Sequence, residues 1–143
     1  MSSTDQNTRN PSRVGPPWSA DLGGVVAAVV CALVTWGSAR LAGVEPAVER
    51  GGEVQEIGGA AVALVAGASA LVGLTALRLL ERSTSRALRL WTGLAAVVTL
   101  VSLLGPLSAT TTAATGTLLS LHAVVAAVVI ASAHASRRRR SID

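Results

Sequence analysis

The chain has 143 residues, of which 50% are hydrophobic and only 14% are charged, and its formal net charge is +4. A soluble domain averages about 25% charged residues, so this composition places the chain in the membrane class instead. The positive charge does not indicate nucleic-acid binding, because the arginines lie at the ends of apolar segments and no base-stacking aromatic side chains accompany them. We therefore expect the lipid bilayer as the surroundings of the chain and no nucleic acid as a partner.

The N-terminal part combines a polar tail with a first apolar segment. Residues 1–18 are rich in Ser, Thr, Asn and Pro, which predicts a disordered tail ending in Trp18 at the membrane surface. Residues 22–41 match the ~20 residues that a helix needs to cross a bilayer core. A cleaved signal peptide with its site at Gly37-Ser38-Ala39 is the less favoured alternative. The tail is long for a leader, and the apolar segment exceeds a typical signal core.

Three further apolar segments follow the first. Residues 57–77 come after a short acidic stretch, and residues 90–107 start beside Trp91, which we expect at the inner membrane interface. Residues 117–136 form the fourth segment and lead into a basic tail, residues 137–143. Each segment is close to the length of a membrane-spanning helix.

The charges between the segments predict their orientation. Residues 78–89, between the second and third segments, carry four arginines against one glutamate, whereas residues 42–55 carry three glutamates against one arginine. Basic loops stay in the cytoplasm, so residues 78–89 are predicted inside and residues 42–55 outside. The sequence thus predicts an all-α membrane protein of the cell membrane, with four antiparallel transmembrane helices and both termini in the cytoplasm.

Small residues recur every four positions in several segments. Such stripes let a neighbouring helix approach closely, which is how helices associate in lipid. The first segment has one small-residue face, formed by Gly24, Ala28 and Ala32. The two stripes that we predict as packing faces are Gly59, Ala63 and Gly67 in the second segment, and Ala123, Ala127, Ala131 and Ala135 in the fourth.

One ionisable side chain, His122, lies well inside an apolar segment. Counting at ~1.5 Å per residue places Ser102 and Thr35 at a similar depth, so the three side chains form a candidate polar cluster. The third and fourth segments share a short loop, which makes Ser102 the expected hydrogen-bond partner of His122. A structural role for this pair is favoured over a transport or proton-relay role and over contact with lipid.

The sequence holds no recognisable catalytic, metal or cofactor motif. Cys31 is the one cysteine, so no internal disulfide is expected. His122 and His134 lie twelve residues apart on one predicted helix, and the resulting ~18 Å excludes them as two axial ligands of one haem within a subunit. No phosphate-binding loop or nucleophile motif is present. We therefore expect a non-enzymatic protein without a cofactor.

Three short stretches carry a resemblance to a known family. Gly43-Val44-Glu45, residues 102–107 and residues 119–125, taken with the four segments, resemble a family of small four-span bacterial membrane proteins catalogued only as a domain of unknown function. The resemblance covers about residues 18–135. It implies a four-span fold and a membrane location but no activity, with His122 among the recurring features.

Two functional hypotheses follow from these patterns. The leading one is a non-enzymatic multi-pass membrane protein that packs with itself or with a partner membrane protein, because small-residue stripes outnumber any chemical motif. The alternative is a small oligomeric transporter or channel subunit with His122 lining its path. The sequence specifies no small-molecule substrate.

Overall fold

A computed structural model describes residues 19–140 of the chain. Along this part, the elements are α1 (Ser19–Leu41), β1 (Ala47–Arg50), β2 (Glu53–Glu56), α2 (Gly59–Ser83), α3 (Ala87–Ser102), the 3-10 helix η1 (Gly105–Ser108) and α4 (Thr112–Arg140). The predicted tail at residues 1–18, with its Trp18 anchor, and the last three residues of the basic tail lie outside the described residues. The first four residues of that basic tail belong to α4.

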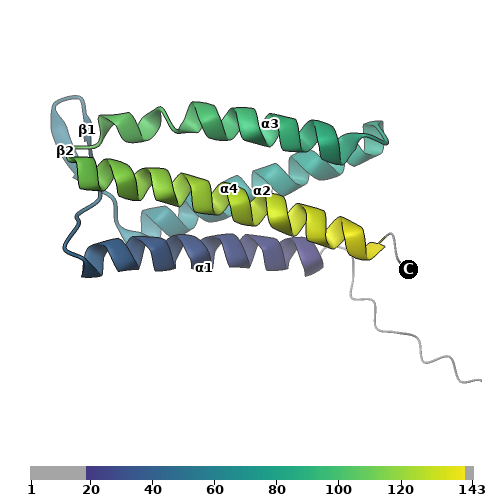
Figure 1. The fold of residues 1–143 in the computed structure, drawn as a ribbon, viewed down its shortest axis with the longest axis horizontal. Helices are drawn as coiled ribbons and strands as arrows, with labels where there is room; N and C mark the ends of the chain where they lie inside the picture. Colours follow the sequence, from purple (N-terminus) through teal and green to yellow (C-terminus); the bar gives the residue numbers. More distant parts are fainter. Residues whose placement is uncertain (1–18, 141–143) are drawn as a thin grey trace, which may run out of the picture.

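The four helices lie side by side. α1 packs against α2 and α4, and α3 packs against the same two helices. The start of α1, the α2–α3 connection and the end of α4 lie at one end of the molecule, which we call the basic end (Figure 1). The two strands and η1 lie at the opposite end, which we call the hairpin end (Figure 1).

Three of the helices are long and apolar enough to cross a membrane. They are Ser19–Leu41, Gly59–Ser83 and Thr112–Arg138, with mean hydropathy of 1.9, 2.1 and 2.0. α3 is also apolar but has only 16 residues, so it is shorter than the predicted third segment. The α-helix ends at Ser102 and gives way to η1, where Pro106 has no N–H to continue an α-helical ladder.

The predicted acidic loop is not irregular. It contains an antiparallel hairpin in which Ala47 pairs with Glu56 and Arg50 pairs with Glu53, so the expectation of a purely α-helical chain is wrong at this point. Gly51 and Gly52 form the turn at φ values of +64° and +86°, a conformation that glycine adopts without steric cost. Two glycines between short runs with valine are a hairpin signal that the sequence already contains.

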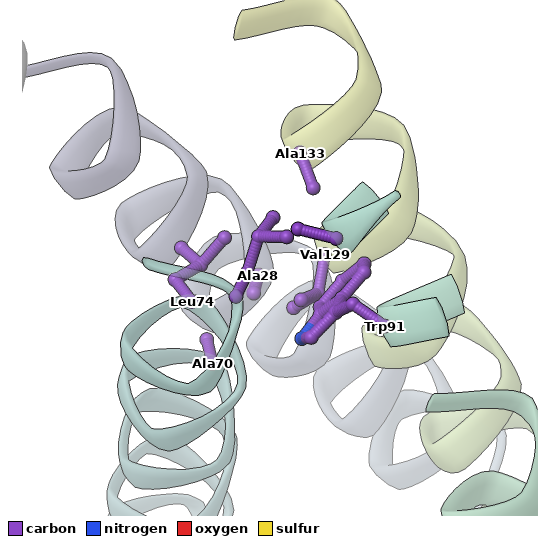
Figure 2. Packing of buried hydrophobic residues seen from close by; sticks show 8 residues of the cluster. Ala28, Ala70, Leu74, Trp91, Val129 and Ala133 are labelled. Atoms are coloured by element: carbon purple, nitrogen blue, oxygen red, sulfur yellow. The ribbon is translucent and has the colours of Figure 1, made fainter. Parts of the chain in front are cut away.

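Two hydrophobic clusters hold the helices together. The cluster nearer the basic end surrounds Trp91, whose indole Nε1–H donates to the carbonyl oxygen of Gly73 at 2.7 Å (Figure 2). Trp91 is only 3% exposed, so its side chain packs inside the bundle, and its depth at the inner membrane interface stays a prediction. The other cluster is formed by Ala32, Val62, Ala66, Leu118 and Leu121.

The predicted small-residue face of α1 is confirmed, since Gly24, Ala28 and Ala32 are all buried. At Gly24 the approach of α4 is so close that an added Cβ would lie 2.9 Å from the Cβ of Ser132. α1 and α4 therefore pack almost backbone to backbone near the basic end.

Candidate functional site

The most extensive polar arrangement in the described chain joins three helices at the basic end. Asp21 of α1 accepts from Arg78 Nε of α2 at 2.7 Å and from Arg137 Nη1 of α4 at 3.2 Å. Arg137 also binds Glu81 of α2 through two parallel contacts, Nε to Oε1 at 2.7 Å and Nη2 to Oε2 at 3.3 Å. We call these four residues the ion-pair cluster.

The helix ends determine where these charges lie. Asp21 is in the first turn of α1, where the helix dipole favours a negative charge, and Arg137 is near the C-terminus of α4, where it favours a positive one. The side chains of Asp21 and Arg137 are only 9% and 12% exposed. A carboxylate so poorly hydrated is stable only with partners, and its two guanidinium contacts satisfy both oxygens. The ion-pair cluster therefore fixes the relative positions of α1, α2 and α4.

The sequence did not predict the ion-pair cluster. Arg137 was expected only as part of the basic tail, and no partner was expected for Asp21. Asp21 and Arg137 are 116 residues apart, and their contact depends on which helices become neighbours. A signal was nevertheless present, because the carboxylate lies at the predicted level of two arginine-rich segments.

The predicted cluster of His122, Ser102 and Thr35 does not form as a hydrogen-bonded unit among the described residues. Each side chain instead bonds to a carbonyl of its own helix: His122 Nδ1 to Leu118 at 2.8 Å, Ser102 Oγ to Thr99 at 2.8 Å, and Thr35 Oγ1 to Cys31 at 2.9 Å. The expected pairing of His122 with Ser102 is therefore corrected. In an apolar setting a carbonyl three or four residues back is the nearest acceptor, and it requires no second helix.

The two predicted packing stripes differ in their surroundings. Gly59, Ala63 and Gly67 are half-buried, and a Cβ at Gly59 or Gly67 would lie 3.0 Å from Trp36 or 3.3 Å from Val29, so this stripe faces α1. The alanine stripe of α4 points outward instead. Its four members are all exposed, and they are Ala123, Ala127, Ala131 and Ala135.

The face of α4 that packs within the molecule is a different one. It consists of Ala114, Leu118, Leu121, Val129, Ala133 and Ser136. The alanine stripe therefore does not pack against another helix of the same chain. Its contact with a second molecule stays a prediction.

A hollow lies at the basic end, at the start of α3 beside α4. It has a volume of about 540 Å³ and is lined by Ser85, Arg86, Leu88, Arg89, Thr92 and His134, and we call it the basic groove. His134 Nε2 lies 3.1 Å from the hydroxyl of Thr92, which itself donates to the Leu88 carbonyl at 2.8 Å. Because a hydroxyl has one proton, both contacts are satisfied when His134 Nε2 carries the hydrogen.

Neither of these sites offers a set of metal ligands. Among residues 19–140 no group of three or more His, Cys, Asp or Glu side chains is arranged to hold a metal ion. Cys31 is a free, half-buried thiol. The chemistry available at the basic end is therefore that of charged hydrogen bonds from guanidinium groups.

Comparison with known proteins gives one match. The model of a family of unknown function, DUF6069, covers residues 12–140. The chain belongs to DUF6069. This confirms the resemblance to an uncharacterised family, and the DUF6069 match includes all four helices and both sites at the basic end. No curated protein and no solved structure matches the chain.

Proposed function

We propose that this DUF6069 chain is a non-enzymatic multi-pass membrane protein that associates in the bilayer with a second copy or with a partner membrane protein. In this proposal its four helices cross the cell membrane in alternating directions. The basic end and both termini lie in the cytoplasm, and the hairpin end lies outside.

The apolar surface of the helices carries the proposal. Only 17%, 28% and 22% of the most apolar windows of α1, α2 and α4 are buried inside the molecule. Large side chains such as Leu64, Val72 and Leu100 are 74%, 70% and 66% exposed. Each such side chain left in water costs about 1.5–3 kcal/mol relative to burial, so the surface is suited to lipid.

The distribution of charge supports the orientation. The basic end contains the end of α2, the α2–α3 connection and the start of α3, which carry Arg78, Arg82, Arg86 and Arg89, and the arginines at the end of α4. The hairpin end carries Glu45, Glu49, Glu53 and Glu56. Positively charged segments are retained in the cytoplasm during insertion, whereas acidic ones have little effect.

The outward-facing alanine stripe supports association with another molecule. It presents four small side chains on one face of α4, where a second helix can approach closely. Two polar side chains within the apolar part of the bundle, those of His122 and Ser102, are bonded to their own helices. Packing therefore fits these helices better than catalysis.

Cysteine cross-linking in membranes tests the proposal. In a Cys31→Ala background, Ala127→Cys is expected to form a disulfide-linked dimer on mild oxidation in reconstituted vesicles. If the partner is another protein, a bifunctional thiol cross-linker gives a larger adduct in native membranes only. Leu64→Cys, exposed on α2, is the control that should give neither product. Equal products from both positions, or none from Ala127→Cys in either setting, would contradict association through α4.

A further inference from the structure

The basic groove contains two arginines that no carboxylate of the described chain neutralises. Arg86 and Arg89 both line the hollow and are exposed, and neither takes part in the ion pairs found among residues 19–140. The acidic side chains at this end are engaged elsewhere. Asp21 and Glu81 both bind Arg137, and Asp21 also binds Arg78. The groove therefore retains an excess of positive charge.

The chemistry of the groove suits a phosphate group. Guanidinium groups present their N–H donors as a fork that matches phosphate oxygens. Arg86 is the N-cap residue of α3, so the positive end of the helix dipole adds to the field of the two side chains. The hydroxyl-bearing Ser85 and Thr92 line the same hollow, and Thr92 is held in place by His134.

The size and surroundings of the groove favour a lipid over a small anion. Its volume of about 540 Å³ lies in the range of sites for whole organic ligands and far exceeds an inorganic ion. Further along the face of α3 that continues from Arg89 at helical spacing, Ala96 is exposed and Leu100 is 66% exposed. A ligand whose charged group occupies the groove thus has apolar surface beside it for acyl chains.

We propose that the basic groove binds the phosphate-bearing headgroup of an anionic phospholipid. The inference rests on the proposed function, which puts the basic end at the cytoplasmic surface of the bilayer, where anionic lipids attract arginine-rich segments. Arg86 and Arg89 bind the phosphate oxygens, and Ser85 donates a further hydrogen bond. His134 holds Thr92 in position in the wall of the groove.

Native mass spectrometry of the full chain tests this inference. The protein is released from phosphatidylcholine nanodiscs prepared with or without phosphatidylglycerol, and retained lipid is counted. We expect phosphatidylglycerol to be retained over phosphatidylcholine. The Arg86→Gln/Arg89→Gln double variant should weaken that retention by about tenfold or more, since two charge-assisted contacts are lost. Arg82→Gln is the matched control, because Arg82 is an exposed arginine in the last turn of α2 that does not line the groove.

The outcomes separate the ligand sources. Equal losses in the double variant and in Arg82→Gln mean general attraction to a basic surface and overturn the groove. Competition by millimolar inorganic phosphate or glycerol phosphate means that a soluble anion is the ligand, which overturns the lipid. Thermal unfolding of the double variant should stay unchanged, because both side chains are exposed and unpaired with carboxylates in the described chain.

Failure of the inference differs from failure of the proposed function. A protein that resists alkaline extraction from vesicles but shows no preference for phosphatidylglycerol refutes the lipid site alone. If alkali extracts the protein from vesicles, both the lipid site and the proposed membrane function are refuted.

Discussion

Asp21 connects three helices through side chains that come from opposite ends of the sequence. Its two oxygens accept from Arg78 and Arg137, so both oxygens of this poorly hydrated carboxylate are paired. A buried ion pair contributes little net free energy compared with a well-packed apolar pair, but loss of one partner is costly. The ion-pair cluster is therefore expected to determine which helix ends meet.

Replacing Asp21 tests this role. Asp21→Asn keeps the size of the side chain but removes its charge, and we expect it to lower the free energy of unfolding by about 1–3 kcal/mol. Thermal unfolding in detergent measures the effect. Glu45→Gln is the control, because Glu45 is 70% exposed and lies 3.9 Å from Arg40, and its loss should cost less than about 0.5 kcal/mol. Equal losses for the two variants would show that Asp21 acts only as a surface charge.

Two adjacent glycines of α1 provide a second test. A Cβ at Gly24 meets Ser132 at 2.9 Å, whereas a Cβ at Gly23 meets nothing within 4 Å. Gly24→Ala should therefore push α1 from α4 and cost about 1–3 kcal/mol. Gly23→Ala should leave stability unchanged or raise it by up to about 1 kcal/mol. Similar unfolding midpoints for both variants are incompatible with the close approach of α1 and α4.

At the scale of single residues, the sequence located polar groups better than it located their partners. His122, Ser102 and Thr35 lie in the helices where they were expected, yet each bonds to a carbonyl of its own helix. Depth along a helix follows from counting residues, but the direction of a side chain around the helix axis depends on tertiary packing. The buried place of Trp91 has the same origin, because aromatic side chains suit both interfaces and cores.

The stripes on α1 and α4 show the corresponding limit for whole helices. Four-residue spacing identifies residues that share a face, and in α1 that face is buried. In α4 the alanine stripe is exposed, while the buried face mixes alanine with leucine and valine. In a soluble protein the polar face reveals which side points outward, but both sides of these helices are apolar.

The two faces of α4 predict different effects of the same substitution. Ala133 is fully buried, so Ala133→Leu should overpack the cluster around Trp91 and cost about 1–3 kcal/mol in thermal unfolding. Ala127→Leu should change the stability of the monomer by less than about 0.5 kcal/mol. It should instead reduce cross-linking from a cysteine at Ala131. Strong destabilisation by Ala127→Leu in monomeric protein would mean that the stripe packs within the chain.

The hairpin is an element that charge alone did not reveal. Its acidic side chains predicted an outward-facing loop. The hairpin signal was instead the pair of glycines that form the turn. The strands are also tied to the end of η1, because Val48 pairs with Ala109 and Thr110 N–H donates to the Ala47 carbonyl at 3.2 Å. Such a long-range contact cannot be inferred from local spacing.

For the whole molecule, hydropathy predicted the number and order of the helices because a membrane-spanning segment is a strong compositional signal. The arrangement of helices around one another was not predictable, since the outward-facing and helix-facing surfaces are both apolar here. The third helix also ends earlier than the predicted segment 90–107, because Pro106 lies in η1 rather than at the end of a long α-helix.

The orientation of the whole chain can be measured directly. Reporter fusions at Glu49 and Thr112 should lie outside the cell, whereas fusions at Ser83 and after Asp143 should lie in the cytoplasm. The expected pattern follows from the arginines at the basic end and the glutamates at the hairpin end. A cytoplasmic signal at Glu49 reverses the proposed arrangement.

The brevity of α3 has a consequence for the membrane itself. With 16 residues α3 extends ~24 Å, against ~34 Å for the 23 residues of α1 and ~30 Å for a hydrocarbon core. In the proposed four-span arrangement we expect the lipids beside α3 to thin to match it, while those beside α1 need not. The hydrophobic mismatch is confined to one side of the protein, so unfolding midpoints should rise as acyl chains shorten through a series of phosphatidylcholines. In that arrangement the protein is expected to favour membrane regions of reduced thickness.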